Sequence, residues 1–353
     1  MRGLSLFVDI EKSFPDFKLS VQLESENDVI ALLGSSGCGK SLTLKCIAGI
    51  VKPDKGCIKI NSKTVFDSAS KTNVPPQKRH VGYLFQNYAL FPTMTVWNNI
   101  FSVIKKPPKQ RHVVVDEMIE KFQLDGIKYL YPQQISGGQQ QRAALARILV
   151  SEPEILMLDE PFSALDTNLR WSVEQEISEV LSEFDGTTVF VSHNRDEVYR
   201  LCDRVAIMNN GSIESTGDKE SIFDSPKTLA AASMTGCKNI SAAEKRGEYK
   251  VYARDWDAEL ETTQPVPDNV QYVGVRAHHF RLTDLTSQGD NIFKCNIQKV
   301  IEEPFEYVFL FSFKENDDGT GILQFRISKD ICEDGNLKEF SLFVPPDKVM
   351  CMV

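Results

Sequence analysis

The fold of this chain is decided by the stretch Gly34-Ser35-Ser36-Gly37-Cys38-Gly39-Lys40-Ser41. It matches the pattern G-x-x-x-x-G-K-[ST], in which glycines let backbone N–H groups converge on phosphate oxygens. The apolar run 28–33 before it is typical of a buried strand, and residues 41–50 after it have the apolar spacing of a helix. A strand, a glycine loop and a helix in this order indicate a true phosphate-binding loop. We therefore expect the loop residues and Leu42 to bind a nucleotide, with Cys38 as a small filler.

Side chains of the loop and of a later strand suit the chemistry of a magnesium nucleotide. Lys40 is expected to bridge the β- and γ-phosphates, and the Ser41 hydroxyl to ligate Mg²⁺. Residues 155–158 predict a strand that delivers Asp159 and Glu160 to the carboxyl end of the sheet, where open α/β folds bind ligands. We expect Asp159 to hold Mg²⁺ through its water shell. Glu160 is expected to polarise the water that attacks the γ-phosphate, the alternative being a helix cap.

Two more polar residues follow predicted strands. His193 follows the strand 187–191, which we expect beside the strand that ends at Asp159, so its imidazole should reach the γ-phosphate. Gln86 ends the strand 81–85 at the entrance to a helical segment, and its amide oxygen can complete the Mg²⁺ shell. A residue in that position could also sense Mg²⁺ and move the helical arm as a hinge. The alternatives are a surface or capping histidine and a polar strand terminus.

A second glycine-containing stretch, residues 135–142, opens a predicted helix. Ser136 and the amides of Gly137 and Gly138, followed by Gln139, form an arrangement that binds anions at a helix N-terminus. The stretch lies about 50 residues after Gln86, in the helical arm, so reaching its own chain's phosphate is difficult. Binding the γ-phosphate held by a second copy solves this geometry and predicts two ATP molecules sandwiched in a two-fold dimer.

The amino-acid composition limits which class of protein this chain can belong to. The 353 residues are 42% hydrophobic and 25% charged, which is ordinary for soluble globular protein. The net charge of −9 argues against a general nucleic-acid binder. We find no apolar run of about 18 residues and no pattern of a signal peptide, so we expect a cytoplasmic protein whose membrane role comes through a partner. The eight cysteines form no C-x-x-C pair, and neither a zinc site nor a disulfide framework is predicted.

The order of strands and helices predicts two domains. Strands alternate with helices up to about residue 232, interrupted by a helical insertion over residues 87–150, which indicates an α/β fold with a parallel sheet. Residues 233–353 change in texture: the runs 271–275, 293–300, 307–313, 321–327 and 340–344 are short, β-rich and separated by polar turns. They predict a small antiparallel β domain, barrel-like in form.

These motifs together resemble the ATP-binding subunit of an ABC transporter. The phosphate loop, Gln86, Ser136 to Gln139, Asp159-Glu160, residues 163–166 and His193 occur in the family's order and approximate spacing over residues 1 to about 230. The resemblance implies a P-loop NTPase with a RecA-like core sheet and a head-to-tail ATP sandwich. It also implies that Asp166 lies near the partner's phosphate loop. An aromatic residue should stack on adenine; Phe14 is preferred by spacing over Phe17. Ile135 replaces the family's usual leucine, a small departure.

The resemblance extends to a subfamily. Residues 82–92 look like prokaryotic importers of small solutes, in which the segment after Gln86, here 86–91, docks an integral membrane permease. Residues 273–280 resemble the accessory β-barrel of such importers, and residues 1–60 look most like molybdate or sulfate importer ATPases. This implies a peripheral protein on the cytoplasmic face of the membrane, linked indirectly to an extracytoplasmic solute-binding protein.

Three alternatives stay open. The solute could be iron, a polyamine or a sugar. A soluble ABC-type ATPase acting on ribosomes or DNA is a different class, but such proteins usually carry two cassettes or a long coiled-coil insertion, and this chain shows one cassette and a short arm. The C-terminal domain could itself bind an oxyanion through Arg276, His278 and His279, against the simpler reading that these residues belong to an ordinary barrel surface.

Overall fold

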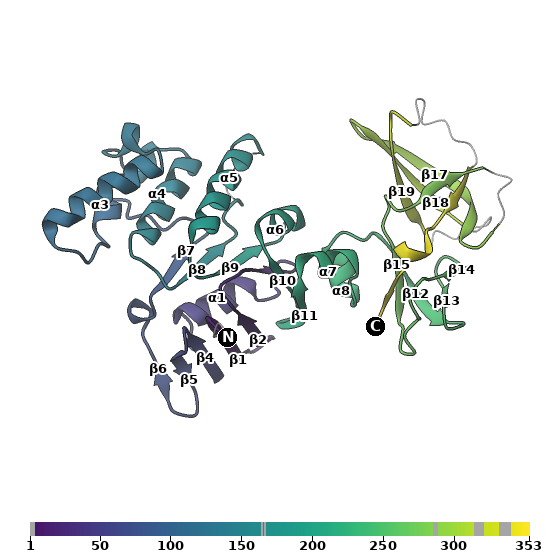
Figure 1. The fold of residues 1–353 in the computed structure, drawn as a ribbon, viewed down its shortest axis with the longest axis horizontal. Coiled ribbons are helices and arrows are strands. Elements are labelled where there is room, and N and C mark those ends of the chain that lie inside the picture. The colour runs from purple at the N-terminus through teal and green to yellow at the C-terminus, as the bar shows by residue number, and fades with distance from the viewer. Residues whose placement is uncertain (1–3, 164, 166, 285–288, 314–320, 332–339) are drawn as a thin grey trace. The chain divides into compact units, whose positions relative to one another are not determined.

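The structure is a computed structural model that describes residues 4–163, 165, 167–284, 289–313, 321–331 and 340–353. The chain divides into two compact units, Met1–Lys219 and Glu220–Val353. Each unit has its own hydrophobic core. Figure 1 shows the mixed α/β first unit and the strand-rich second unit.

The first unit is built on one 11-stranded sheet. In sheet order its strands are β6 (Thr72–Asn73), β5 (Lys63–Asp67), β4 (Lys55–Ile60), β1 (Leu6–Phe14), β2 (Phe17–Ser25), β11 (Ser212–Asp218), β10 (Arg204–Asn209), β3 (Val29–Leu33), β9 (Thr187–Ser192), β8 (Ile155–Asp159) and β7 (Val81–Leu84). The half from β6 to β2 is antiparallel, because β1 pairs with both β2 and β4 in that sense. The half from β3 to β7 is parallel.

The parallel half brings the predicted strands together as the sequence analysis expects. Leu33 of β3 pairs with Ser192 of β9, and Val191 pairs with Asp159 of β8. On the far side of β8, Leu158 pairs with Leu84 of β7. The carboxyl ends of these four strands therefore share one edge of the sheet. Strands β8 and β9 are buried along their whole length, as expected for the centre of a parallel sheet.

The helices flank this sheet and form the insertion. They are α1 (Lys40–Ala48), α2 (Val96–Phe101), α3 (Pro108–Lys121), α4 (Gly137–Leu149), α5 (Thr167–Glu183) and α6 (Arg195–Leu201). Short 3-10 turns cover Pro76–Lys78, Asp125–Ile127 and Pro132–Gln134. Helices α2, α3 and α4 lie within residues 87–150, so the helical insertion is confirmed. Figure 1 shows α3, α4 and α5 gathered near the β7–β8–β9 end of the sheet.

Helix α1 is fixed at both ends by local chemistry. It starts after Gly39, whose φ of 109° lies in the left-handed region, and ends at Gly49, whose φ is 80°. A C-terminal glycine in this conformation lets the last carbonyls be satisfied. The fully buried Arg79 guanidinium donates to two of them, the carbonyl oxygens of Cys46 (3.0 Å) and Ile47 (2.8 Å). The segment 71–79 thus carries β6, a 3-10 turn and an anchor for α1.

The second unit begins earlier than the expected boundary at residues 232 and 233. Helices α7 (Lys219–Asp224) and α8 (Leu229–Met234) belong almost entirely to it. The reason is that Arg276 of this unit donates to the carbonyl oxygens of Thr235, at 2.7 Å, and Phe223. Ala232 also packs in one buried cluster with Met350 and Met352. These contacts outweigh the change in composition that suggested the later boundary.

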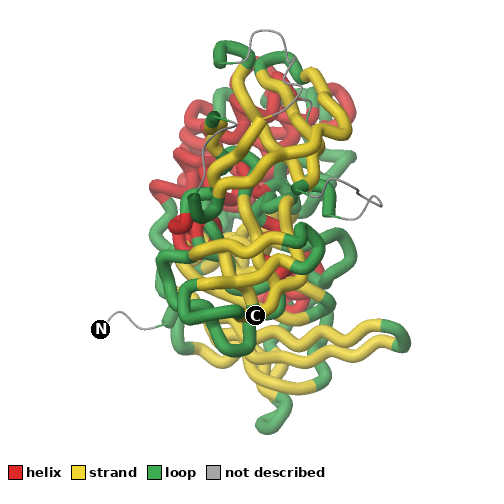
Figure 2. Tube along the Cα trace, turned by 90° about the vertical axis from the view of Figure 1, so that its right-hand side faces the viewer, coloured by secondary structure: helices red, strands yellow, loops and turns green. Residues whose placement is uncertain are grey.

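The rest of the second unit is two five-stranded antiparallel sheets, which confirms the predicted β domain. One has the order β14 (Ala258–Glu261), β13 (Lys250–Ala253), β12 (Asn239–Lys245), β15 (Tyr272–Val275), β21 (Met350–Met352). The other has the order β16 (Arg281–Thr283), β20 (Phe340–Phe343), β17 (Ile292–Glu302), β18 (Glu306–Ser312), β19 (Leu323–Ser328). A 3-10 turn covers Pro346–Lys348. Strands, drawn yellow in Figure 2, dominate this unit, and aromatic residues such as Phe309 and Phe311 fill the core.

Candidate nucleotide site

The phosphate loop is shaped by close approaches that only glycine permits. A Cβ atom on Gly34 would lie 2.3 Å from the carbonyl oxygen of Met208 in β10. Cys38 is buried beneath the loop, while Ser35, Ser36 and Gly37 are exposed. The Lys40 ammonium is buried and donates to the carbonyl oxygens of Gly34 (2.8 Å) and Ser35 (2.9 Å). An ammonium has three N–H donors, so one remains to contact a phosphate.

A serine, an aspartate and a tyrosine meet beside the loop. The Ser41 hydroxyl donates to Oδ1 of Asp159 at 2.7 Å, which joins α1 to β8. The Tyr83 hydroxyl of β7 donates to the other oxygen, Oδ2, at 2.8 Å. Burial and the neighbouring carboxylate raise the pKa of Tyr83 far above its usual value, so the phenol keeps its proton. A hydroxyl next to a carboxylate is a set of hard oxygen ligands that fits Mg²⁺.

The carboxylate of Glu160 faces the imidazole of His193. Oε1 of Glu160 lies 3.3 Å from Nδ1 of His193, with the histidine side chain 59% exposed and the glutamate 21% exposed. Glu160 has a φ of 46°, a left-handed conformation that is uncommon for glutamate. Its backbone N–H donates to the carbonyl oxygen of Val191 at 3.0 Å, which holds this conformation against β9. Glu160 precedes α5 by several residues, so it is not a helix cap.

The turn that presents His193 has support that sequence reasoning missed. The buried carboxylate of Glu197, on α6, accepts from the Ser192 hydroxyl at 2.7 Å and from the Asn194 amide at 3.2 Å. The backbone N–H of Asn194 donates back to the Ser192 hydroxyl at 2.9 Å. Burial raises the pKa of Glu197. A glutamate four residues after a candidate catalytic histidine was the available signal, and only its burial gives it meaning.

Gln86 lies in the turn after β7 and is exposed. The strand ends at Leu84, one residue before the expected end at residue 85, and the register of β7 with β8 keeps Gln86 near the edge that carries Asp159. The following segment is pinned by the fully buried Asn99. Its amide accepts from the N–H of Phe91 at 2.8 Å and donates to the carbonyl oxygens of Phe91 and Met94, both at 3.1 Å.

In the second glycine stretch, Ser136 and Gln139 form a capping box. The Ser136 hydroxyl accepts from the backbone N–H of Gln139 at 3.4 Å, and the Gln139 side chain accepts from the N–H of Ser136 at 2.9 Å. This arrangement starts α4 at Gly137 and satisfies donors that would otherwise be unpaired. Ser136 is exposed, and among the described residues no hydrogen bond or ion pair joins this stretch to the phosphate loop of the same chain.

The sequence also predicts Phe14 and Asp166 as site residues. Phe14 lies at the end of the β1–β2 hairpin with 44% of its surface exposed, and the Lys12 ammonium is 5.7 Å from its ring centre. Phe17 is closer to the phosphate loop, since a Cβ on Gly39 would lie 3.1 Å from its ring. Stacking of adenine on Phe14 stays a prediction. Asp166 falls outside the described residues.

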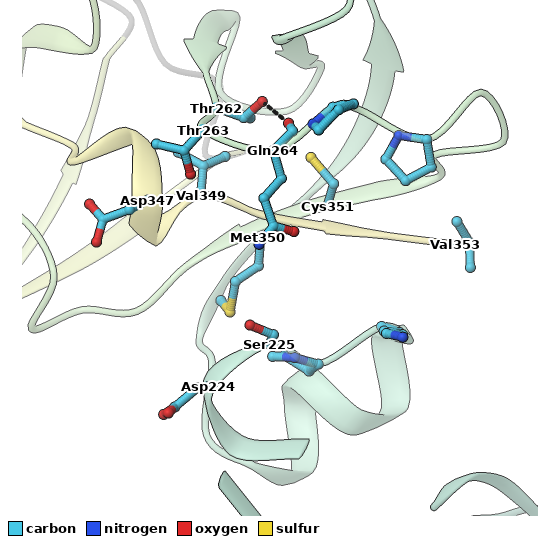
Figure 3. A pocket seen from close by; sticks show the side chains of 14 residues that line it. Asp224, Ser225, Thr262, Thr263, Gln264, Asp347, Val349, Met350, Cys351 and Val353 are labelled. Carbon is cyan, nitrogen blue, oxygen red and sulfur yellow. Dashed lines mark hydrogen bonds between the residues drawn. The ribbon is translucent and has the colours of Figure 1, made fainter. Parts of the chain in front are cut away.

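The second unit holds a separate cavity of about 250 Å³, drawn in Figure 3. Thr263, Gln264, Met350 and Cys351 line it, together with the carboxylates of Asp224 and Asp347. Lys227 also lines the cavity, but two carboxylates against one ammonium disfavour an oxyanion there. The Arg276 guanidinium, considered for such a site, is buried and bonded to backbone carbonyls and to the Thr235 hydroxyl at 3.0 Å. Of the three residues considered for an oxyanion, Arg276 is thus already bound to groups of its own unit.

The fold and the site together define a P-loop nucleotide-binding protein. A sequence model described as "ABC transporter" matches residues 18–163. The chain is 37% identical to the spermidine/putrescine import ATP-binding protein PotA of Thermobifida fusca, covering 82% of this chain and 75% of that protein. Its identity is 35% to the Fe(3+) ions import ATP-binding protein FbpC of Vibrio cholerae, covering 78% and 77%.

A sulfate relative and a solved structure extend the comparison. The chain is 36% identical to the sulfate/thiosulfate import ATP-binding protein CysA of Caulobacter vibrioides, over 78% of this chain and 81% of that protein. The solved structure of cbiO1 from Clostridium perfringens, part of the ABC transporter complex cbiONQ, superposes with a TM-score of 0.55. It is 27% identical and covers 62% of this chain and 90% of that one. The chain therefore belongs to the family of ABC importer ATP-binding subunits, which are ATPases coupled to transport.

Proposed function

We propose that this chain hydrolyses ATP between two head-to-tail copies of itself and thereby drives solute import. The observation that carries the proposal is the shared sheet edge. There the phosphate loop, the Ser41–Asp159 pair and the Glu160–His193 pair come from three neighbouring strands and one helix. Open α/β sheets bind ligands at this edge.

Each side chain at this edge has a task in the proposed reaction. The loop amides and Lys40 bind the β- and γ-phosphates, as oriented donors at a helix N-terminus do. Ser41 and Asp159, with Gln86, hold Mg²⁺, which when bound neutralises charge on the phosphate oxygens. Glu160 accepts the proton of the attacking water. His193 donates toward the γ-phosphate and keeps the Glu160 carboxylate in place.

The second half of each site is proposed to come from the other copy. The N-terminus of α4 points backbone N–H groups outward and carries partial positive charge. Ser136 and Gln139 hold this terminus in shape, and Gly137 and Gly138 let a phosphate approach the backbone. The γ-phosphate bound by one copy then meets Ser136 to Gln139 of the other, and Asp166 is proposed to link the two sites.

Coupling to transport is proposed to run through the segment that follows Gln86. Phe91 and Met94 are 45% and 36% exposed, an apolar surface held in fixed geometry by the buried Asn99. Such a rigid, exposed apolar surface suits a permease helix. In the described residues no helix is long and apolar enough to cross a membrane. We propose that the chain lies at the cytoplasmic face, bound to a permease and connected through it to a solute-binding protein. The second unit is proposed to be an accessory domain.

The solute is proposed to be sulfate or molybdate. Sulfate is supported by the CysA relative, whereas the relatives reported above include none named for molybdate. The PotA and FbpC relatives, at similar identity, make polyamine and iron import the competing candidates. Uptake of radiolabelled sulfate, molybdate, putrescine and iron into cells with and without this chain separates them. Loss of putrescine or iron uptake alone would overturn the oxyanion proposal.

The sandwich is tested on the purified chain. The Glu160→Gln variant is expected to bind ATP and elute as a dimer in gel filtration when Mg²⁺ and ATP are present, and as a monomer without nucleotide. A variant that binds ATP with wild-type affinity and stays monomeric at every protein concentration would contradict the two-copy site.

A further inference from the structure

The two oxygens of the Asp159 carboxylate have different partners. Oδ1 accepts from Ser41 on α1, at 2.7 Å, and so faces the nucleotide side. Oδ2 accepts from Tyr83 on β7, at 2.8 Å, and so faces the neighbouring strand. Asp159 is 6% exposed, so few water molecules compete for either oxygen. The sequence alone does not indicate a role for Tyr83; its contact with Asp159 does.

The tyrosine is itself held rigidly. Its ring stacks on that of Phe85, with ring centres 4.1 Å apart and an angle of 20° between the planes. Its backbone is fixed by the parallel pairing of β7 with β8, in which Tyr83 lies opposite Met157. The hydroxyl therefore approaches Asp159 from a fixed direction.

We propose that Tyr83 is a positioning residue that fixes the rotation of the Asp159 carboxylate and so presents Oδ1 to Mg²⁺ at Ser41. The terminal torsion of an aspartate is broad, and a carboxylate without a second anchor can rotate away from a metal. A donor on the outer oxygen removes that freedom. Partners of this kind commonly change metal affinity by about 10- to 100-fold. The inference rests on the proposed assignment of Mg²⁺ to Ser41 and Asp159.

The test compares Tyr83→Phe with Tyr88→Phe as a matched control. Tyr88 is buried whereas Tyr83 is half-buried, and the Tyr88 hydroxyl has no hydrogen-bond partner in the described part of the chain. Equilibrium dialysis gives the Kd for ATP with EDTA and with Mg²⁺. The Kd in EDTA divided by the Kd in Mg²⁺ reports metal-dependent binding. We expect Tyr83→Phe to reduce this ratio about 10-fold while leaving the Kd in EDTA unchanged. Tyr88→Phe should change neither value. Equal weakening with and without Mg²⁺ in Tyr83→Phe would overturn the proposal.

An Asp159→Asn background separates the positioning role of Tyr83 from the assignment of Mg²⁺ to Asp159. If Tyr83 acts through Asp159, Tyr83→Phe has no further effect on the ratio in that background. The same reduction in both backgrounds would show that Tyr83 acts independently of Asp159, and the proposal would fail. If Asp159→Asn alone leaves the ratio at its wild-type value, the Mg²⁺ assignment of the proposed function is wrong. Thermal unfolding of each variant, and binding of Mn²⁺ followed by electron paramagnetic resonance, give readouts that do not depend on hydrolysis.

Discussion

The phosphate-loop edge and the Ser136–Gln139 turn are both proposed to bind the same γ-phosphate, yet they are built differently. At the edge, side chains from separate elements meet one another: Ser41 with Asp159, and Glu160 with His193. At the turn, the two polar side chains bond to each other's backbone, in a capping box within four residues. The edge is assembled by the tertiary fold, whereas the turn is assembled locally.

This difference predicts how substitutions in each half of the site should act. A substitution at the edge removes a partner from a tertiary contact and should act on one chain alone. A substitution at the turn leaves the single chain's nucleotide contacts intact and should act only when two copies meet. The predictions below test this division, beginning with the largest expected effect.

Glu160→Gln should slow ATP hydrolysis by ~10²–10⁴-fold, because the general base is lost. Phosphate release at saturating Mg²⁺ and ATP measures the rate, and equilibrium dialysis should show unchanged ATP affinity. Glu152→Gln is the matched control: this exposed glutamate also has a left-handed φ, 52°, but lies outside the site. Hydrolysis at the wild-type rate in Glu160→Gln would show that another residue is the base.

Lys40→Ala should weaken ATP binding itself by about 10- to 100-fold, since hydrogen bonds to a charged group contribute ~1.5–3 kcal/mol. The loss should appear in a monomeric preparation, in the absence of Mg²⁺, because Lys40 belongs to the same chain's loop. Lys45→Ala, on the same helix, controls for loss of charge. An unchanged Kd in Lys40→Ala would place the phosphates away from the loop.

Ser136→Ala, combined with Glu160→Gln, should abolish the ATP-dependent dimer while leaving the ATP affinity of the monomer within about twofold. It should also lower the free energy of unfolding by ~1 kcal/mol, as loss of an N-cap does. Thr95→Ala removes the corresponding cap of α2, where Thr95 accepts from the N–H of Asn98 at 3.2 Å, and controls for that loss. If the ATP-dependent dimer persisted in Ser136→Ala and dissociated in Thr95→Ala, the proposed role of Ser136 between the two copies would be wrong.

The smallest effect is expected outside both regions, at His279. Burial, helped by His278, lowers the pKa of His279 to about 4. The folded state therefore keeps this imidazole neutral while the unfolded state, with an ordinary pKa near 6.5, takes up a proton. Stability should fall as the pH drops from about 6.5 toward 4. His279→Asn should show a shallower fall in Tm between pH 7 and pH 5, with ATP affinity unchanged at pH 7. Parallel Tm curves would show that His279 does not carry this dependence.

Much of the first unit could be predicted because its motifs are local. The glycine loop, the buried runs before Asp159 and His193, and the serine that caps α4 each leave a short pattern in the sequence. The strands β1 and β2 were not predicted. Their alternation is visible in Leu6, Val8 and Ile10, which are buried, but strands that pair across a hairpin need their partner's register to be recognised.

What could not be predicted depends on contacts between distant residues. The Tyr83 hydroxyl gains a role only because β7 lies beside β8, and Glu197 only because α6 folds back over the turn after β9. The boundary between the units was displaced for the same reason, since Arg276 binds carbonyl groups more than 40 positions before it in the chain. Composition reports none of these pairings.

The buried Arg79 has a mechanical consequence. It clamps the end of α1 that is farthest from the nucleotide, through the carbonyl groups of Cys46 and Ile47. A helix clamped at its carboxyl end can shift only at its amino end, where Lys40 and Ser41 lie. A displacement caused by phosphate binding is therefore expected in residues 34–39 and at Asp159, which bonds to Ser41.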